Sequence, residues 1–318
     1  MDITDKKNAK NSEVKEKIYF SKGVLKSATQ KAIRRGEVEK AVRCTKSFLE
    51  LDELDCLRRS MIWPAEDVLL HPQYDELAKL TYKLSQKGSV PLTDKEKTKV
   101  LTIVGDFARC EYRDLDVDNP DDPGEAYQMK SITGREVDLV NALLFRARAG
   151  GSRYDVPMLN QMARVWNKRF SEKTWDVEKL KSYYTGKVIE WKSVAYAQRE
   201  DILPESIDMH TDPWIMGKLL QKPDVKDLLH KLIPINDRDW ANDGWADVNI
   251  IEQVMWCCRS SINLKLNIWM KPPRTVSYLE ADHIPERLWP AFEELYRRIE
   301  PDLDEIAKLK LDRQAEKM

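Results

Sequence analysis

The sequence predicts an all-α protein, a multi-helix bundle, from three observations. Apolar residues recur at spacings of three and four along most of the 318 residues, which is the period of a helix with one buried face. Glycine is scarce, with 11 in the chain, about half of its usual share. Pairs of Thr and Glu three residues apart mark helix starts. Together these features favour helices with short joints and argue against a glycine-rich nucleotide-binding fold.

Residues 24–35 form the first predicted helix, and Gly36 suits its end because glycine adopts the left-handed conformation freely. A second helix is predicted from one stripe of residues at helical spacing: Val38, Ala41, Val42, Thr45, Phe48 and Leu49. The next helix is predicted from the stripe Leu54, Leu57 and Met61. Pro64 ends this helix and begins another.

Thr93 with Glu96, and Thr133 with Glu136, are spaced as capping boxes at two further helix starts. The second box opens a helix over about 134–148. Later helices are predicted over 157–170, 176–185, 187–200, 213–221, 224–232, 248–260 and 290–299. At most one short extended segment is expected, near 262–269, because apolar and polar residues alternate there.

The charges of the whole chain nearly cancel, with 53 Lys and Arg against 54 Asp and Glu. Their distribution along the chain is uneven. Residues 17–46 carry nine cations and two acids, whereas 111–125 carry seven acids and one Arg. The second stretch is also rich in proline and does not follow the EF-hand order of ligands, so it is interpreted as an acidic linker loop. The predicted division is a flexible segment 1–22, a helical domain 23–110, this linker 111–125, and a larger helical domain 126–318.

Several classes of protein are not expected from this composition. No apolar run approaches the ~20 residues that span a bilayer, and the polar N-terminus has no apolar region typical of a signal peptide. Five cysteines, without CxxC spacing, are expected to be buried thiols in a reducing cytoplasm. The four histidines share no ligand spacing, so no metal site and no cofactor are predicted.

Residues 25–72 read LKSATQKAIRRGEVEKAVRCTKSFLELDELDCLRRSMIWPAEDVLLHP. This segment resembles the start of the C-terminal helical domain of RarA/MgsA-type AAA+ ATPases, through Arg34-Arg35-Gly36, VEKAVRC, an LRR helix, Glu66-Asp67-Val68 and His71-Pro72. The resemblance implies a collar-like domain that assembles oligomers and carries no catalysis. The chain departs from that family by lacking G-x-x-x-x-G-K-[ST], so no ATPase activity is expected.

Two basic segments, 17–46 and 145–170, are the candidate DNA-binding surface, because Arg and Lys beside aromatic residues hold phosphates and stack bases. The alternative is that they are solvated helix faces. The candidate residues are Lys31, Arg34, Arg35, Arg146, Arg148, Arg153, Tyr154, Arg164 and Lys168.

Asp208 and His210 are the candidate catalytic residues, in the loop LPESIDMHTDPW of residues 203–214. Residues two apart in an extended loop point the same way, so Asp208 is placed to orient His210 or to act at a sugar C1′. The alternative is that both are loop residues that satisfy helix ends.

Polar residues that converge beside tryptophan make the third candidate site, a pocket for a flat, polar base. The residues are Trp256, Arg259, Ser260 and Asn263, with Trp245 in a loop that closes over them. A helix end capped by Ser and Asn is the alternative.

The leading hypothesis is therefore an atypical DNA glycosylase that extrudes a base of duplex DNA, including a modified phage base, in a setting of phage defence. The L-P-G-x-G motif of the commonest helical glycosylases is absent. Two alternatives stay open. One is a non-enzymatic adaptor at the replication fork, with oligomers formed through the collar-like domain. The other is a phage-encoded inhibitor that acts through protein contacts.

Overall fold

A computed structural model describes residues 20–114, 116, 132–149, 155–202, 213–238, 246–265 and 284–315. The predicted all-α class is confirmed: these residues form helices and contain no strand. Within them, no helix is both long and apolar enough to cross a membrane.

The first two helices follow the sequence signals closely. α1 (Lys22–Arg35) begins at Ser21, whose hydroxyl accepts the N–H of Val24, and ends at Gly36 with φ 74°. α2 (Val38–Leu51) follows at once and packs along α1. The left-handed conformation at Gly36 makes the tight turn between them, as the sequence predicts.

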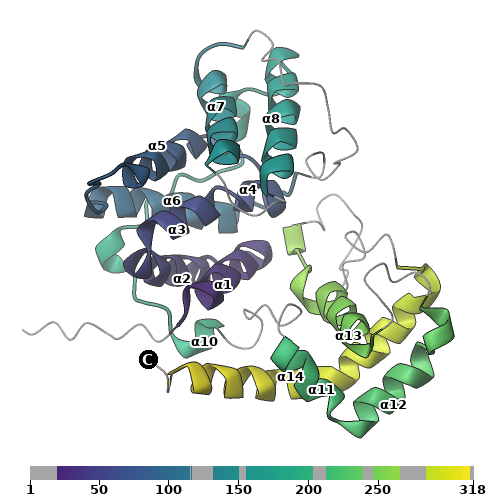
Figure 1. Ribbon diagram of the computed structural model, residues 1–318. Helices are drawn as coiled ribbons and strands as arrows, with labels where there is room; N and C mark the ends of the chain where they lie inside the picture. The colour runs from purple at the N-terminus through teal and green to yellow at the C-terminus, as the bar shows by residue number, and fades with distance from the viewer. Residues whose placement is uncertain are drawn as a thin grey trace, which may run out of the picture.

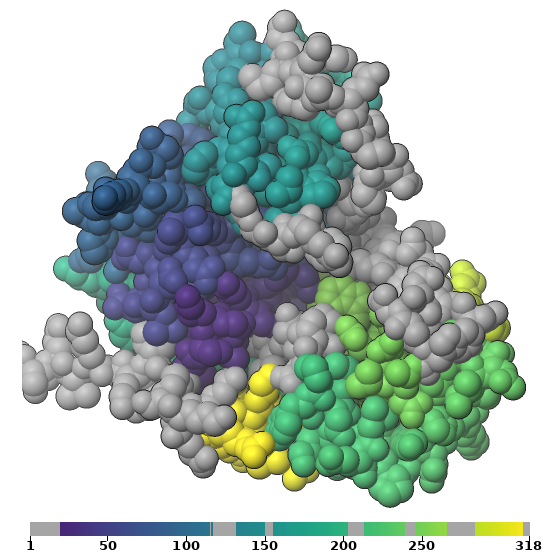
Figure 2. Space-filling model, in the orientation of Figure 1, coloured from purple at the N-terminus to yellow at the C-terminus, as the bar shows by residue number. Residues whose placement is uncertain are grey.

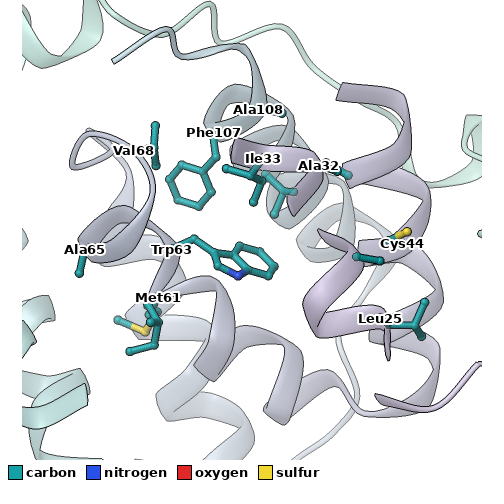
Figure 3. Packing of buried hydrophobic residues seen from close by; sticks show 14 of the residues in the cluster. Leu25, Ala32, Ile33, Cys44, Met61, Trp63, Ala65, Val68, Phe107 and Ala108 are labelled. Carbon is teal, nitrogen blue, oxygen red and sulfur yellow. The ribbon is translucent and has the colours of Figure 1, made fainter. Parts of the chain in front are cut away.

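The next four helices complete the core of the N-terminal half. They are α3 (Glu53–Ser60), α4 (Trp63–Glu66), α5 (Tyr74–Ser85) and α6 (Asp94–Arg109). Pro64 lies in the first turn of α4, and Thr93 and Glu96 form the predicted capping box of α6. Trp63 and Phe107 are fully buried at the centre of this core, where Figure 3 shows them beside Ile33. All five cysteines are buried thiols.

α7 (Arg135–Arg148) and α8 (Asp155–Ser171) stand side by side above α5 (Figure 1). The predicted capping box at the start of α7 is wrong. Gly134, with φ 68°, precedes the helix, and no side chain caps its first turn. A capping box needs an N-cap residue in the extended conformation, which Gly134 does not adopt.

The two helices predicted over 176–185 and 187–200 are largely wrong. α9 (Val177–Lys181) is a single turn, and α10 (Arg199–Ile202) is another. Between them the chain is extended, apart from a 3₁₀ turn at Trp191–Ser193. Side chains of α6 accept hydrogen bonds from the backbone N–H groups of this extended segment. These bonds take the place of the backbone hydrogen bonds that a helix would make.

Four helices form a second group, shown in green and yellow in Figures 1 and 2. They are α11 (Pro213–Leu220), α12 (Pro223–Leu232), α13 (Asp247–Met255) and α14 (Trp289–Ala315). α14 runs far beyond the predicted 290–299 and contains Pro301. Interior proline weakens a helix, but Leu303 and Ala307 continue its buried face.

α13 passes into one turn of π-helix, Trp256–Ser260. Residues 264 and 265 then lie in a 3₁₀ turn, and the rest of the extended segment predicted near 262–269 lies outside the described residues.

The contacts between helices define two groups, and the boundary between these groups does not coincide with the predicted linker 111–125. α7 packs on α5, and α8 packs on α4, so both belong with the N-terminal helices, while α11–α14 pack on one another. At the start of the linker, both oxygens of Asp114 accept hydrogen bonds from Arg169 of α8, at 2.6 and 3.0 Å. The described part of the acidic stretch is therefore tied to α8.

Candidate functional site

A groove of about 510 Å³ lies along one face of α6. Its walls are that face, from Lys95 to Asp106, the turn of residues 71–73, and residues 181–188. We call it the α6 groove. A volume of this size is typical of pockets that hold small ligands or short segments of chain.

Residues 185–191, which we call the strap, lie along α6 and bond to a row of its side chains. The strap is extended between Gly186, with φ 61°, and Trp191, which begins a 3₁₀ turn. Thr102 accepts the N–H of Ile189 at 3.0 Å, and Thr98 accepts the N–H of Trp191, also at 3.0 Å. Four residues of helix rise about 6 Å, and two residues of extended chain advance about 6.6 Å. This match lets alternate backbone groups of the strap meet hydroxyls one helical turn apart.

Gly105 lets the strap approach α6 closely. A Cβ at this position would clash with Cδ1 of Ile189. The side chain of Ile189 therefore occupies the space that any other residue at position 105 would fill.

His71 and Asp106 are buried at the floor of the groove, with His71 Nε2 3.5 Å from Asp106 Oδ2. The other ring nitrogen of His71, Nδ1, accepts the N–H of Gln73 at 3.0 Å, so Nε2 carries the hydrogen and points it at the carboxylate. Asp106 also accepts the hydroxyl of Thr185 at 2.8 Å and the N–H of Gly186 at 3.1 Å. The carboxylate thus holds the start of the strap in place.

The pKa values of this pair agree with a positioning role. Burial lowers the pKa of His71, which keeps the ring neutral at pH 7. Burial opposes ionisation of Asp106, but hydrogen bonds from His71 and Thr185 hold its pKa below the ordinary value. Both nitrogens of His71 and both oxygens of Asp106 are engaged in hydrogen bonds within the protein. No cluster of His, Cys, Asp or Glu within the described ranges is placed to hold a metal ion.

The rim of the groove is positively charged. Lys95 and Lys99 lie one turn apart on α6, and Lys181 lies at the end of α9. Lys95 is exposed and has no ion pair with any described residue. Lys99 pairs with Glu76, and Lys181 pairs with Glu178 at 2.6 Å. Lys95 is therefore the rim lysine without an ion pair among the described residues, and the lining carboxylate of Asp106 is hydrogen-bonded.

Most of the predicted DNA-binding cations that the structure describes bond within the protein. Arg34 pairs with Asp67 and donates to the carbonyl of Ser260 at 2.6 Å. Arg35 donates to the carbonyl of Arg259 at 3.2 Å. These bonds hold α1 to the segment after α13, and the guanidinium of Arg34 is buried.

Two more of those cations are also buried. Lys31 donates to Ser27 at 2.7 Å, and Arg146 binds Asp155 at 3.1 Å. Arg148 and Lys168 are exposed, and Arg164 is partly buried. The remaining two candidates, Arg153 and Tyr154, lie outside the described residues.

The predicted base pocket is occupied by packing between the two groups of helices. Arg259 pairs with Asp304 of α14 at 3.0 Å, and Asn263 donates to the carbonyl of Asp67 at 3.1 Å. Ser260 is fully buried and Trp256 partly so. The contacts of Asn263 with Asp67 and of Ser260 with Arg34 join the two groups of helices. Trp245 and the predicted catalytic residues Asp208 and His210 lie outside the described residues.

Lys265 fastens this joint to the end of α6. Lys265 is 5% exposed, and its ammonium group donates to the carbonyls of Phe107 at 2.8 Å, Ala108 at 3.0 Å and Cys110. These are carbonyls that the end of a helix leaves without partners, at the negative end of its dipole.

Lys265 makes stability depend on pH. Burial lowers the pKa of Lys265 from 10.5 to about 8. Between pH 8 and pH 10.5 the unfolded chain therefore binds more protons than the folded protein, and the free energy of unfolding rises with pH. Over the whole interval this contribution reaches about 3 kcal/mol. The stability of the wild type relative to Lys265→Met should rise by that amount between pH 7 and 10.5, measured by urea denaturation. Parallel pH curves would contradict the assignment.

Comparison of the chain with protein-family models and curated proteins, and of its fold with solved structures, found no match. The resemblance of residues 25–72 to a collar domain therefore stays a prediction. Within that segment, the structure pairs Arg34 of the basic motif with Asp67 and places His71 at the floor of the groove.

Sequence reasoning missed the α6 groove. One sequence pattern points to it: the polar residues Thr98, Thr102 and Asp106 recur every four residues and so lie on one side of α6. The strap that this row binds comes from more than 80 residues further along the chain, and the sequence does not show that partner.

Proposed function

We propose that this protein is a non-enzymatic adaptor whose α6 groove takes an anionic partner. The observation that carries the proposal is the placement of charge in the groove. Lys95, Lys99 and Lys181 stand at the rim, while the carboxylate on the floor has its oxygens engaged. An anion is attracted to the rim lysines, and the carboxylate of Asp106 on the floor is already satisfied by hydrogen bonds.

Binding is favoured over catalysis by the state of the groove's titratable groups. A general acid or base must have its reactive atom within reach of a ligand. His71 uses one nitrogen for Gln73 and the other for Asp106. Tyr184 donates its hydroxyl to the carbonyl of Leu69. Lys95 has no ion pair among the described residues, and Lys99 and Lys181 each hold one carboxylate, so the role of the lysines is electrostatic.

Reversing the charge of Lys95 and Lys99 tests the proposal. In Lys95→Glu/Lys99→Glu, the affinity for fluorescein-labelled decaglutamate should fall at least about tenfold at 0.1 M salt, since attraction becomes repulsion. Fluorescence anisotropy measures the change. Lys226→Glu/Lys231→Glu on α12 is the matched control, because both lysines are exposed and without ion pairs among the described residues. An equal loss in both variants, or none in either, would reject the groove as the site.

Duplex DNA is a second candidate partner, supported by the exposed cations Arg148 and Lys168 of the predicted basic segment. Arg148→Glu/Lys168→Glu should then weaken binding of a duplex oligonucleotide and reduce its dependence on salt, while Lys226→Glu/Lys231→Glu should not. Glycosylase chemistry is a further step that rests on Asp208 and His210. It predicts abasic sites in duplexes with normal or modified bases, and their loss in Asp208→Asn.

A further inference from the structure

The strap has two edges, and only one of them bonds to α6. In an extended segment, successive N–H groups point to opposite edges. The N–H groups of Ile189 and Trp191 point to Thr102 and Thr98. Those of Val188 and Glu190 therefore point away from this row of hydroxyls.

Part of this second edge is unpaired within the part of the chain that the structure describes. The carbonyl of Glu190 accepts the N–H and the hydroxyl of Ser193, at 3.0 and 2.8 Å, but three other backbone groups are open. Neither the N–H nor the carbonyl of Val188 meets a hydrogen-bond partner there, and the N–H of Glu190 meets none. Val188 lines the α6 groove and is 60% exposed. An extended edge with free backbone groups and an exposed β-branched side chain is a template for another extended chain.

The lysines of the rim indicate which chain would fit. Lys95 and Lys99 lie one turn apart on α6, a rise of about 6 Å. Alternate side chains on one face of an extended peptide are about 6.6 Å apart. Carboxylates at every second position of such a peptide would therefore match the two lysines in spacing as well as in charge.

We propose that the α6 groove binds an acidic segment of a partner protein in extended conformation, through backbone hydrogen bonds to Val188 and Glu190 and alternate carboxylates at Lys95 and Lys99. This inference rests on the proposed anion-binding function and adds the class of partner and its conformation. The α6 face from Lys95 to Asp106 rises about 16 Å, which five extended residues span.

A nucleic-acid strand fits these observations less well. Its phosphates would satisfy the lysines, but its backbone has no alternating N–H and carbonyl groups to pair with the strap. An acidic peptide satisfies both the charge of the rim and the free edge of Val188 and Glu190.

The test uses a fluorescein-labelled octapeptide of alternating Glu and Val and two N-methylated forms of it. One form is methylated at the Glu residues and the other at the Val residues, so each removes the N–H groups of one edge. We expect one form to bind at least about tenfold more weakly than the parent peptide, because it loses the hydrogen bonds to the strap. The other form should bind nearly as well and is the matched control.

Amide hydrogen exchange on the full-length protein reports on the strap itself. In the free protein, the amides of Ile189 and Trp191 should exchange slowly and those of Val188 and Glu190 quickly. Adding the parent peptide should slow exchange at Val188 and Glu190. This alternating pattern is specific to pairing along one edge.

The outcomes separate this inference from the proposed function. If both methylated peptides bind as tightly as the parent while Lys95→Glu/Lys99→Glu still weakens binding, the extended pairing is overturned and the anion groove stands. If the lysine variant binds the peptide unchanged, both fail. If a single-stranded oligonucleotide binds more tightly than the peptide and depends on the same lysines, the partner is nucleic acid and the inference is overturned. Circular dichroism checks that the variant is folded.

Discussion

Asp67→Ala is expected to lower the free energy of unfolding by about 3–5 kcal/mol, because it leaves a buried guanidinium without its counter-charge. Asp67 is 1% exposed and pairs with Arg34, and its second oxygen accepts a hydrogen bond from Gln30 at 2.7 Å. Arg34 also holds the carbonyl of Ser260. The loss should therefore weaken the joint between the two groups of helices as well as the core around α1.

A double variant separates the lost ion pair from lost packing. Arg34→Met/Asp67→Leu replaces both charges by apolar side chains, and it should recover most of the stability that Asp67→Ala loses. Urea denaturation at pH 7 measures all three proteins. A loss below about 1 kcal/mol in Asp67→Ala would mean that Arg34 finds another partner and that the pair does not hold the joint.

Asp106→Ala is expected to cost about 3 kcal/mol and to free the strap, since it removes a buried carboxylate that accepts several hydrogen bonds. The N–H of Gly186, the hydroxyl of Thr185 and Nε2 of His71 all lose their partner. Because the strap forms one wall of the α6 groove, the affinity for acidic peptides should fall with it.

Hydrogen exchange followed by mass spectrometry shows where Asp106→Ala acts. Exchange should increase more in residues 185–191 than in α11–α14. Asp138→Ala on α7 is the control, since that carboxylate is half exposed and its ion pair is with Arg135 of its own helix. If exchange of the strap does not change, Asp106 does not anchor it.

Local signals in the sequence were sufficient for most helices. Gly36 ends α1 with a left-handed residue, and Thr93 with Glu96 caps α6, because each involves neighbours in the chain. Thr133 with Glu136 has the same spacing and forms no cap, since Gly134 adopts φ 68° and starts the helix later. The spacing alone does not report that conformation.

Internal ion pairs explain why some of the candidate cations are buried in the protein. A run of cations predicts a surface for phosphate only if the cations lack internal partners. Arg34 finds Asp67 from more than 30 residues away, and Arg146 finds Asp155. The strap was predicted as helix because its partners, Thr98 and Thr102, lie about 90 residues earlier. The sequence contains both halves of each contact but does not show that they meet.

Chemical-shift mapping of the labelled protein with decaglutamate tests the central claim, that the α6 groove is the anion-binding site. The account predicts that the shifted amides cluster at Lys95, Lys99 and residues 185–190, and that Lys95→Glu/Lys99→Glu abolishes the shifts. Shifts of equal size in α11–α14 that persist in this variant would contradict it.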